Sequence, residues 1–215
     1  MKFRDRIDAG DALADKLIKY GYGNSDTIVL AIPRGGIILA DIVAKKIGAE
    51  FDILIPRKLG APSNEELAIG AVMEDGTSYL NKYIIDALHI PKDYIQREIE
   101  HQIEEIKRRT TTYRDQGKSY NINGKRTILV DDGIATGATI IASARWLRKN
   151  SPSSTIVVAV PVAPPQSIEV LEQEADSVVV LYSPTDFGAV GQFYEKFEPV
   201  SDDQVIKIMR ARGLL

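Results

Sequence analysis

The sequence predicts an α/β fold organised around a doubly wound, mainly parallel sheet of five strands. Its apolar runs are continuous rather than alternating, as strands buried on both faces of a sheet require. Stretches with helical periodicity separate most of these runs, and that alternation is typical of βαβ units. The predicted strands are TIVLAI (27–32), FDILI (51–55), RTILV (126–130), TIVVAV (155–160) and SVVVLY (177–182).

The helices are predicted from apolar residues spaced three and four apart and from the signals at their ends. Four of them are expected over residues 8–20, 37–47, 138–149 and 165–175. A last helix is expected to begin at Ser201 and to run to Arg212. Its start is predicted because Ser201 and Gln204 have the spacing of a capping box.

An insertion interrupts the alternation of strands and helices. Residues 71–81 predict a hairpin, because Asp75-Gly76 suits a tight turn. A long helix follows from Pro91 to about Arg109, and its apolar stripe consists of Ile95, Ile99, Ile103 and Ile106. We therefore expect one domain over residues 1–215, with a hairpin and helical insertion at about 60–120.

The outer face of the long helix is predicted to be a solvated surface without a catalytic role. Two i,i+4 ion pairs are expected on it, Glu104–Arg108 and Glu105–Arg109. The chain has 2 histidines, and neither has a partner at the spacing of a metal site, so we assign them no role.

Composition excludes several classes of function. The net charge of -3 gives no electrostatic reason to expect nucleic-acid binding. The absence of cysteine excludes disulfides, thiolate nucleophiles and cysteine-ligated metals. The start of the chain lacks the apolar core of a signal peptide, and no apolar run is long enough to span a bilayer. We expect a cytoplasmic protein that binds neither nucleic acid nor a membrane.

The most informative segment is RTILVDDGIATGATI (126–140), which contains a strand, a loop and the start of a helix. Asp131 and Asp132 are adjacent carboxylates at the end of the strand, and two like charges this close need neutralisation or hydrogen-bond donors. A vicinal diol supplies two donors, and a divalent cation can share the negative charge. The carboxylates therefore predict a site for a sugar with two free hydroxyls.

The rest of this loop has the features of a phosphate site. Gly137 allows backbone N–H groups to approach an anion, and Thr136 and Thr139 add hydroxyl donors. The following helix directs its positive end at the same place. A simple helix-capping turn is the alternative interpretation, but the full combination of strand, acidic pair and ATGxT is more specific than such a turn.

The segment VDDGIATGAT resembles the phosphoribosyl pyrophosphate (PRPP) motif of type I phosphoribosyltransferases. The resemblance implies that Asp131 and Asp132 bind the ribose hydroxyls and, through PRPP, Mg²⁺. It also implies that the 5-phosphate is bound by Ala135, Thr136, Gly137, Ala138 and Thr139. The wider chain is similar to a branch of predicted phosphoribosyltransferases through FRDRIDAG, AIPRGG and IPRKLGAPSNEELAIGAV. This similarity covers nearly the whole chain.

One position departs from part of that family. In 6-oxopurine phosphoribosyltransferases, the position that matches Ala135 is usually an acidic residue that receives a proton from the base. Alanine cannot do this, so the loop looks more like that of adenine-type enzymes. A hypoxanthine or guanine acceptor is therefore in doubt.

Two further loops supply candidates for a pyrophosphate site. In AIPRGG (31–36), Arg34, Gly35 and Gly36 offer a cation and unhindered N–H groups. The resemblance implies that this loop contacts pyrophosphate, often through an unusual peptide geometry. A glycine turn with a surface arginine is the alternative.

In IPRKLGAP (55–62), Arg57 and Lys58 are candidates for stabilising charge that develops on leaving pyrophosphate. The resemblance favours Lys58 and implies that Gly60 to Leu67 form a mobile cover. A surface charge pair is the alternative.

The segment after the last strand, residues 183–199, carries aromatic rings among glycines. Phe187, Phe193 and Tyr194 could stack on a heterocyclic base, or they could close the end of the sheet. The resemblance implies a small hood, built from the N-terminal helix and residues of about 183–215, that contacts the acceptor.

Together these features imply a phosphoribosyltransferase. In its reaction, pyrophosphate leaves C1 of the ribose of PRPP, and a nitrogen acceptor, expected to be a nucleobase, takes its place. The family implies Mg²⁺ as cofactor, PRPP and a small acceptor as partners, and a homodimer. A non-catalytic PRPP or nucleotide sensor of the same fold is one alternative, although the presence of Arg34 and Lys58 favours an enzyme. Another kind of phosphate-binding α/β enzyme is disfavoured, because GxxxxGK[ST] and GxGxxG are absent.

Overall fold

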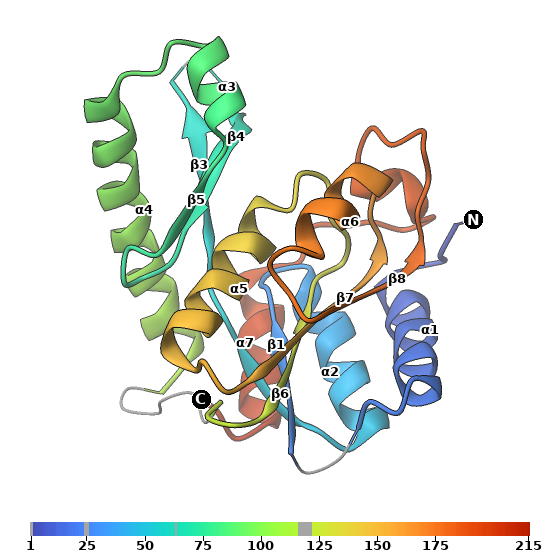
Figure 1. The fold of residues 1–215 in the computed structure, drawn as a ribbon. Coiled ribbons are helices and arrows are strands. Elements are labelled where there is room, and N and C mark those ends of the chain that lie inside the picture. Colours follow the sequence, from blue (N-terminus) through green and yellow to red (C-terminus); the bar gives the residue numbers. More distant parts are fainter. Residues whose placement is uncertain (1, 24–25, 63, 116–121) are drawn as a thin grey trace.

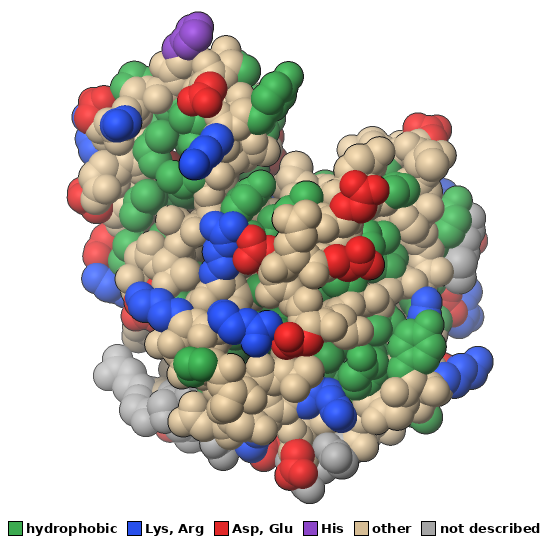
Figure 2. Space-filling view, viewed as in Figure 1, with side chains coloured by type: hydrophobic (Ala, Val, Ile, Leu, Met, Phe, Trp, Pro, Cys, Tyr) green, Lys and Arg blue, Asp and Glu red, His purple; other side chains and the backbone are tan. Residues whose placement is uncertain are grey.

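The computed structural model describes residues 2–23, 26–62, 64–115 and 122–215. A parallel sheet lies at the centre with helices on both faces, and an arm stands away from one end of it (Figure 1). The arm consists of residues Arg57–Tyr113. A notch separates the arm from the rest of the molecule (Figure 2).

The central sheet has five parallel strands in the order β2-β1-β6-β7-β8. Their bounds are β1 Thr27–Ala31, β2 Glu50–Ile53, β6 Arg126–Val130, β7 Thr155–Val162 and β8 Ser177–Tyr182. These are the five strands that the apolar runs predict, so the predicted fold class is confirmed. In this order β1 and β6 are neighbours, and their carboxyl ends lie side by side at Ala31 and Val130.

Helices bury both faces of the sheet, which explains why the apolar residues of the strands form continuous runs instead of alternating with polar ones. Successive strand residues belong to different cores: Val29 packs in one and Leu30 in the other. The first core is covered by α1 (Arg6–Lys19), α2 (Gly36–Ile47) and α7 (Asp202–Ala211). The second is covered by α5 (Ala138–Asn150) and α6 (Pro165–Leu171).

The arm contains a second sheet of three antiparallel strands, β3 (Arg57–Ala61), β4 (Asn64–Val72) and β5 (Ser78–Leu80). The predicted hairpin is confirmed as the β4–β5 pair, with Gly76 in its turn at φ +82°. β3 was not predicted, because RKLGA has neither alternation nor β-branched residues. The short helix α3 (Lys82–Ala87) was not predicted either.

The long helix of the arm is α4 (Lys92–Tyr113), which starts directly after Pro91 and ends four residues later than predicted. The Glu105–Arg109 ion pair is confirmed at 2.8 Å. The predicted Glu104–Arg108 pair is wrong: Glu104 contacts Lys107, and Arg108 makes two hydrogen bonds to Glu105. Arg108 and Arg109 thus share one carboxylate.

The segment after β8 is joined to the start of the chain. The Phe3 N–H donates to the Phe193 carbonyl, and the Glu195 N–H donates to the Phe3 carbonyl, both at 2.8 Å. A short 3₁₀ helix, η1 (Val190–Phe193), lies in this segment. The capping box predicted at Ser201 and Gln204 is confirmed at the start of α7. Within the described ranges, no helix has both the length and the apolar character needed to cross a membrane.

Candidate functional site

Two loops meet at the carboxyl ends of β1 and β6, where ligands of open α/β sheets bind. The loop after β1 contains Gly35 and Gly36, and the loop after β6 contains Asp131 and Asp132. A Cβ placed on Gly35 would overlap the Oδ2 atom of Asp132. A Cβ on Gly36 would lie 2.9 Å from the Asp131 Cα atom. The two glycines therefore permit the close approach of the loops.

The adjacent carboxylates form the acidic part of the site. The Asp132 N–H donates to Asp131 Oδ1 at 2.8 Å. Burial raises the pKa of Asp131 well above its ordinary value, and Asp132 raises it further, while Lys58 opposes both effects. Burial also raises the pKa of Asp132, although Arg6 opposes it. A ligand that donates hydrogen bonds or brings positive charge would relieve this accumulation of negative charge.

Arg6 is a member of the site that the sequence prediction missed. It is the first residue of α1, and its Nε donates to Asp132 Oδ2 at 2.8 Å. Its Nη1 donates to the Glu198 carbonyl at 2.7 Å, and its guanidinium lies 4.0 Å from the centre of the Phe197 ring. The motif FRDRIDAG contains Arg6, but no spacing rule could connect it with a carboxylate 126 positions later.

The loop from Ala135 to Thr139 has the geometry of an anion cradle. Gly137 has φ +77° and caps α5 without any side-chain hydrogen bond to the first turn. The N–H groups at the start of α5 therefore remain available to a ligand, and the helix dipole favours an anion there. The loop is held in place by Ser167, whose Oγ donates to the Ala135 carbonyl at 2.5 Å.

Two cavities meet at the acidic pair. One of about 230 Å³ is lined by residues 131–139 together with Lys58, Val190 and Phe197. The other, of about 580 Å³, extends toward the arm. Both are lined by Lys58, Asp131, Asp132 and Thr139. The larger cavity is also lined by Arg34, Gly35 and Arg57, so it contains all the cations expected at a pyrophosphate site.

The arm provides one wall of the larger cavity. Arg57 and Lys58 lie on strand β3 rather than in a loop. The segment from Gly60 to Leu67, expected to be a mobile cover, belongs to the β3–β4 hairpin. The hairpin is attached to α4, because the Tyr94 hydroxyl donates to the Gly60 carbonyl at 3.0 Å. Whether this cover moves remains a prediction; residue 63 lies outside the described residues.

Arg34 projects from the loop after β1 into the same cavity, and the peptide bond between Pro33 and Arg34 is cis. This is an unusual geometry of the kind that the family resemblance implies for this loop. Arg34 Nη1 lies 3.3 Å from Asp202 Oδ1 at the start of α7. The same carboxylate oxygen accepts a hydrogen bond of 2.5 Å from the Tyr113 hydroxyl at the end of α4.

The phosphoribosyl transferase domain family matches residues 3–198. The chain belongs to this family. It is 40% identical to TT1426 from Thermus thermophilus, whose crystal structure has a TM-score of 0.79 to this one and aligns over 97% of this chain and 98% of that chain. It is 38% identical over 207 residues to Rv0571c of Mycobacterium tuberculosis (strain H37Rv), a protein provisionally named a phosphoribosyl transferase. The chain covers 46% of that relative, and the match covers 96% of this chain.

For a member of the phosphoribosyl transferase family, the acidic pair is a candidate metal site. Across the described residues, no three His, Cys, Asp or Glu side chains converge as ligands for an ion. Asp131 and Asp132 supply oxygen donors of the type that Mg²⁺ prefers, but Mg²⁺ needs six ligands. The donor set therefore fits an Mg²⁺ ion that takes further oxygens from a bound substrate and from water.

The predicted base-stacking residues need a correction. Phe193 and Tyr194 are only 8% and 3% exposed, so neither ring has a free face for a base. They close the end of the sheet, as the alternative interpretation held: Tyr194 packs on Phe3, and Phe193 packs on Phe187. Only Phe187 is partly exposed, beside Ala135 and Thr136 in a separate cavity.

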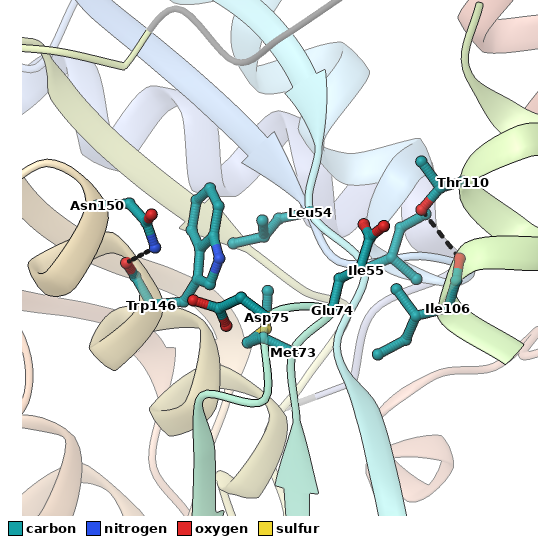
Figure 3. Close-up of a pocket in the computed structure, with 9 residues that line it drawn as sticks. All are labelled: Leu54, Ile55, Met73, Glu74, Asp75, Ile106, Thr110, Trp146 and Asn150. Carbon is teal, nitrogen blue, oxygen red and sulfur yellow. Dashed lines mark hydrogen bonds between the residues drawn. The ribbon is translucent and has the colours of Figure 1, made fainter. Parts of the chain in front are cut away.

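Another cavity, of about 330 Å³, lies between α4 and α5, and it contains none of the predicted site residues (Figure 3). Its floor is apolar and its rim carries two carboxylates. It is lined by Leu54, Ile55, Met73, Glu74, Asp75, Ile106, Thr110, Trp146 and Asn150. Asp75 already pairs with Lys149 at 2.9 Å. Nothing in this cavity suggests transfer chemistry.

Proposed function

We propose that the chain transfers the 5-phosphoribosyl group from PRPP to a nitrogen acceptor and releases pyrophosphate. The proposal rests on the position of two neighbouring cavities. The acidic pair and the anion cradle adjoin a second cavity in which Arg34, Arg57 and Lys58 gather. The acidic pair matches the ribose of PRPP, the anion cradle matches its 5-phosphate, and the cations match its pyrophosphate.

In the proposed complex, Asp131 and Asp132 accept hydrogen bonds from the ribose hydroxyls. The N–H groups of residues 135–139 and the hydroxyls of Thr136 and Thr139 bind the 5-phosphate. Such charge-assisted bonds contribute roughly 1.5–3 kcal/mol each. Arg6 keeps Asp132 oriented through its ion pair. The sugar is thereby bound at both ends, which fixes the position of C1.

The reaction breaks the bond from C1 to the pyrophosphate oxygen and forms a bond from C1 to the acceptor nitrogen. The bonding electron pair leaves with pyrophosphate, and the acceptor loses a proton. Arg34, Gly35, Gly36, Arg57 and Lys58 are the proposed pyrophosphate ligands. Lys58 is the best placed to stabilise the charge that develops on the leaving oxygen, because it lines both cavities.

Mg²⁺ is the proposed cofactor. Asp131 and Asp132 would hold it indirectly, through bound PRPP, and it would neutralise charge on the leaving pyrophosphate. The proposed acceptor is a nucleobase, which would give the protein a role in nucleotide salvage. The Ala135 side chain offers no proton acceptor. Two partly exposed rings line cavities beside the 5-phosphate loop: Phe187 lies beside Ala135 and Thr136, and Phe197 lines the cavity of residues 131–139.

The test is a screen of nucleobases and small amines with PRPP and Mg²⁺, in which pyrophosphate release is followed. Asp132→Asn is the control, because it should lower both PRPP affinity and turnover. The variant also removes the charge that pairs with Arg6, so its stability is measured alongside, and we expect the protein to remain folded. The related possibility, a PRPP sensor, predicts tight PRPP binding but no pyrophosphate release with any acceptor. PRPP affinity that is unchanged in Asp132→Asn by calorimetry would argue against the ribose-binding role of the acidic pair.

A further inference from the structure

The inner face of α4 contributes side chains to the larger cavity that no sequence motif identifies. Gln102 and Arg109 both line it. They are seven residues apart and therefore lie on one face of the helix. The Arg109 side chain is 16% exposed, whereas that of its neighbour Arg108 is 57% exposed. Arg109 thus belongs to the cavity wall, and Arg108 belongs to the outer surface.

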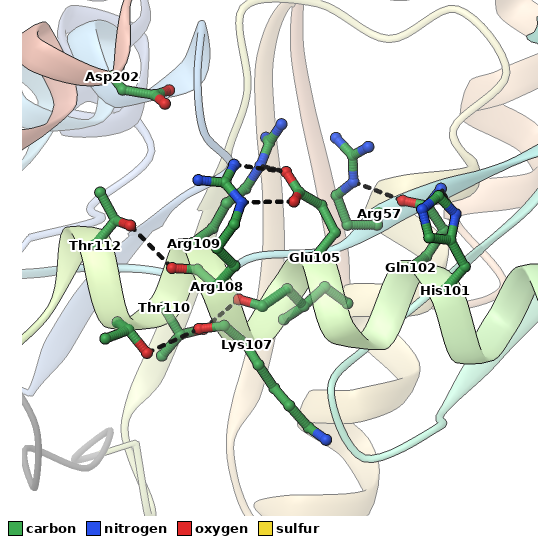
Figure 4. Close-up of polar contacts among 12 residues, drawn as sticks. Arg57, His101, Gln102, Glu105, Lys107, Arg108, Arg109, Thr110, Thr112 and Asp202 are labelled. Carbon is green, nitrogen blue, oxygen red and sulfur yellow. Dashed lines mark hydrogen bonds and ion pairs between the residues drawn. The ribbon is translucent and has the colours of Figure 1, made fainter.

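Arg57 and Arg109 approach each other across this wall (Figure 4). Arg57 has a neutral partner: its Nε donates to Gln102 Oε1 at 2.8 Å. The Gln102 amide is itself oriented, because its Nε2 donates to Glu98 at 2.9 Å. Burial lowers the pKa of Arg57, and the proximity of Arg109 lowers it further.

Glu105 and Glu98 are the carboxylates that act on Arg57, and both raise its pKa, but they do not cancel the opposite effects of burial and of Arg109. Among the described residues, Arg57 makes no ion pair. Arg109 has to share the carboxylate of Glu105 with Arg108. Like charges held close together in a partly buried wall repel each other, and a further anion bound beside them would reduce this repulsion. A guanidinium also presents paired N–H donors that match the oxygens of a phosphate group.

We propose that Arg109 is a further binding residue for the pyrophosphate group, acting together with Arg57. This inference rests on the proposed function, because it assumes that PRPP occupies the larger cavity. It assigns part of the donor site to α4 of the arm. The arm then distinguishes PRPP and pyrophosphate from ribose 5-phosphate, which has no group that reaches this wall.

The experiment compares Arg109→Gln with Arg108→Gln by calorimetry, using inorganic pyrophosphate and ribose 5-phosphate as separate ligands in the presence of Mg²⁺. The two variants remove one positive charge each from adjacent positions that share Glu105. We expect Arg109→Gln to weaken pyrophosphate binding about 10-fold or more, the loss of one charge-assisted hydrogen bond. We expect its ribose 5-phosphate affinity to stay unchanged, and Arg108→Gln to resemble the wild type with both ligands.

Equal pyrophosphate affinities of Arg109→Gln and Arg108→Gln would overturn the inference, and so would a parallel loss of ribose 5-phosphate binding in Arg109→Gln. If Arg109→Gln does not fold, Arg109→Lys replaces it; this variant keeps the charge but loses the planar fork, and it should show a smaller loss that is again confined to pyrophosphate. Wild-type protein that binds neither PRPP nor pyrophosphate would instead refute the proposed function.

Discussion

Arg6 and Asp132 form an ion pair with 2.8 Å between Nε and Oδ2, and both side chains are largely buried. The arginine also donates to the Glu198 carbonyl and stacks on Phe197. One guanidinium group thus connects three parts of the chain: its start, the acidic pair after β6 and the segment after β8. This contact fixes the orientation of Asp132, and it makes the acidic pair dependent on residues at both ends of the sequence.

We therefore predict that Arg6→Met is strongly destabilising. Removing one partner of a buried ion pair leaves an uncompensated charge, which typically costs about 3–5 kcal/mol. The pKa of Asp132 should rise further, since Arg6 acts to lower it. Urea unfolding at neutral pH measures the loss. The matched control is Arg4→Met, because Arg4 is 76% exposed and pairs with Asp8. Similar stabilities of the two variants would contradict the structural role of Arg6.

A second prediction concerns Gly35→Ala. The added Cβ would overlap Asp132 Oδ2, so the acidic pair must move. We expect a loss of about 1–3 kcal/mol in stability from overpacking and a loss of ribose 5-phosphate affinity of about 10-fold. Gly48→Ala serves as the control: its φ is +68°, but no atom lies within 4 Å of the added Cβ. It should be destabilised by backbone strain and still bind ribose 5-phosphate normally. Binding by Gly35→Ala that equals binding by Gly48→Ala would show that the close approach is unnecessary.

A third prediction concerns Asp202, which contacts both Tyr113 and Arg34. Tyr113 is fully buried, and its hydrogen bond to a carboxylate should contribute about 1.5–3 kcal/mol. The Arg34–Asp202 pair is about 40% exposed on both sides, so its contribution should be about 0.5 kcal/mol or less. Two double-mutant cycles measure the coupling energies: one combines Tyr113→Phe with a substitution of Asp202, and the other combines Arg34→Gln with the same substitution. A larger coupling to Arg34 than to Tyr113 would contradict this order.

A fourth prediction concerns acid stability. Hydrogen bonds from Arg108, and then from Arg109, lower the pKa of Glu105 to about 2. Unfolded chains bind this proton at a higher pH, so Glu105 stabilises the fold above about pH 5 and loses this effect as the pH falls toward 2. The stability difference between wild type and Glu105→Gln should therefore shrink over this range. Unfolding curves at several pH values test this expectation. Glu104→Gln serves for comparison, because the Glu104 side chain is 72% exposed. A difference that stays constant with pH would exclude Glu105 as the source.

A fifth prediction separates binding from catalysis. Lys58→Ala should lower turnover about 100-fold but change PRPP binding much less, if Lys58 stabilises charge that appears only as pyrophosphate leaves. Steady-state kinetics and calorimetry on the same preparation provide the comparison. Lys82→Ala, on α3 of the same arm, should leave both quantities unchanged. Equal losses of turnover and PRPP affinity in Lys58→Ala would mean that this lysine binds substrate and transition state alike.

The local signals in the sequence are sufficient for the sheet and for the anion cradle. The five strands are predicted because burial on both faces imposes continuous apolar runs, and Asp131 to Thr139 are contiguous, so their juxtaposition needs no knowledge of the fold. The β3 strand and the extension of α4 are harder to predict. Arg57 to Ala61 pair with β4 through backbone hydrogen bonds, which leave no pattern in the side chains.

The fold class, the family resemblance and the residues of the loop proposed to bind ribose 5-phosphate are all predictable from the order of amino acids, because each depends on side chains close together along the chain. Three features depend on the tertiary structure: Arg6 neutralises Asp132, Phe193 and Tyr194 are buried, and Arg109 faces the same cavity as Arg57. Burial and ion pairing depend on distance in space rather than along the chain. Helices and strands bring together groups more than 100 positions apart, and no periodicity records which ones will meet.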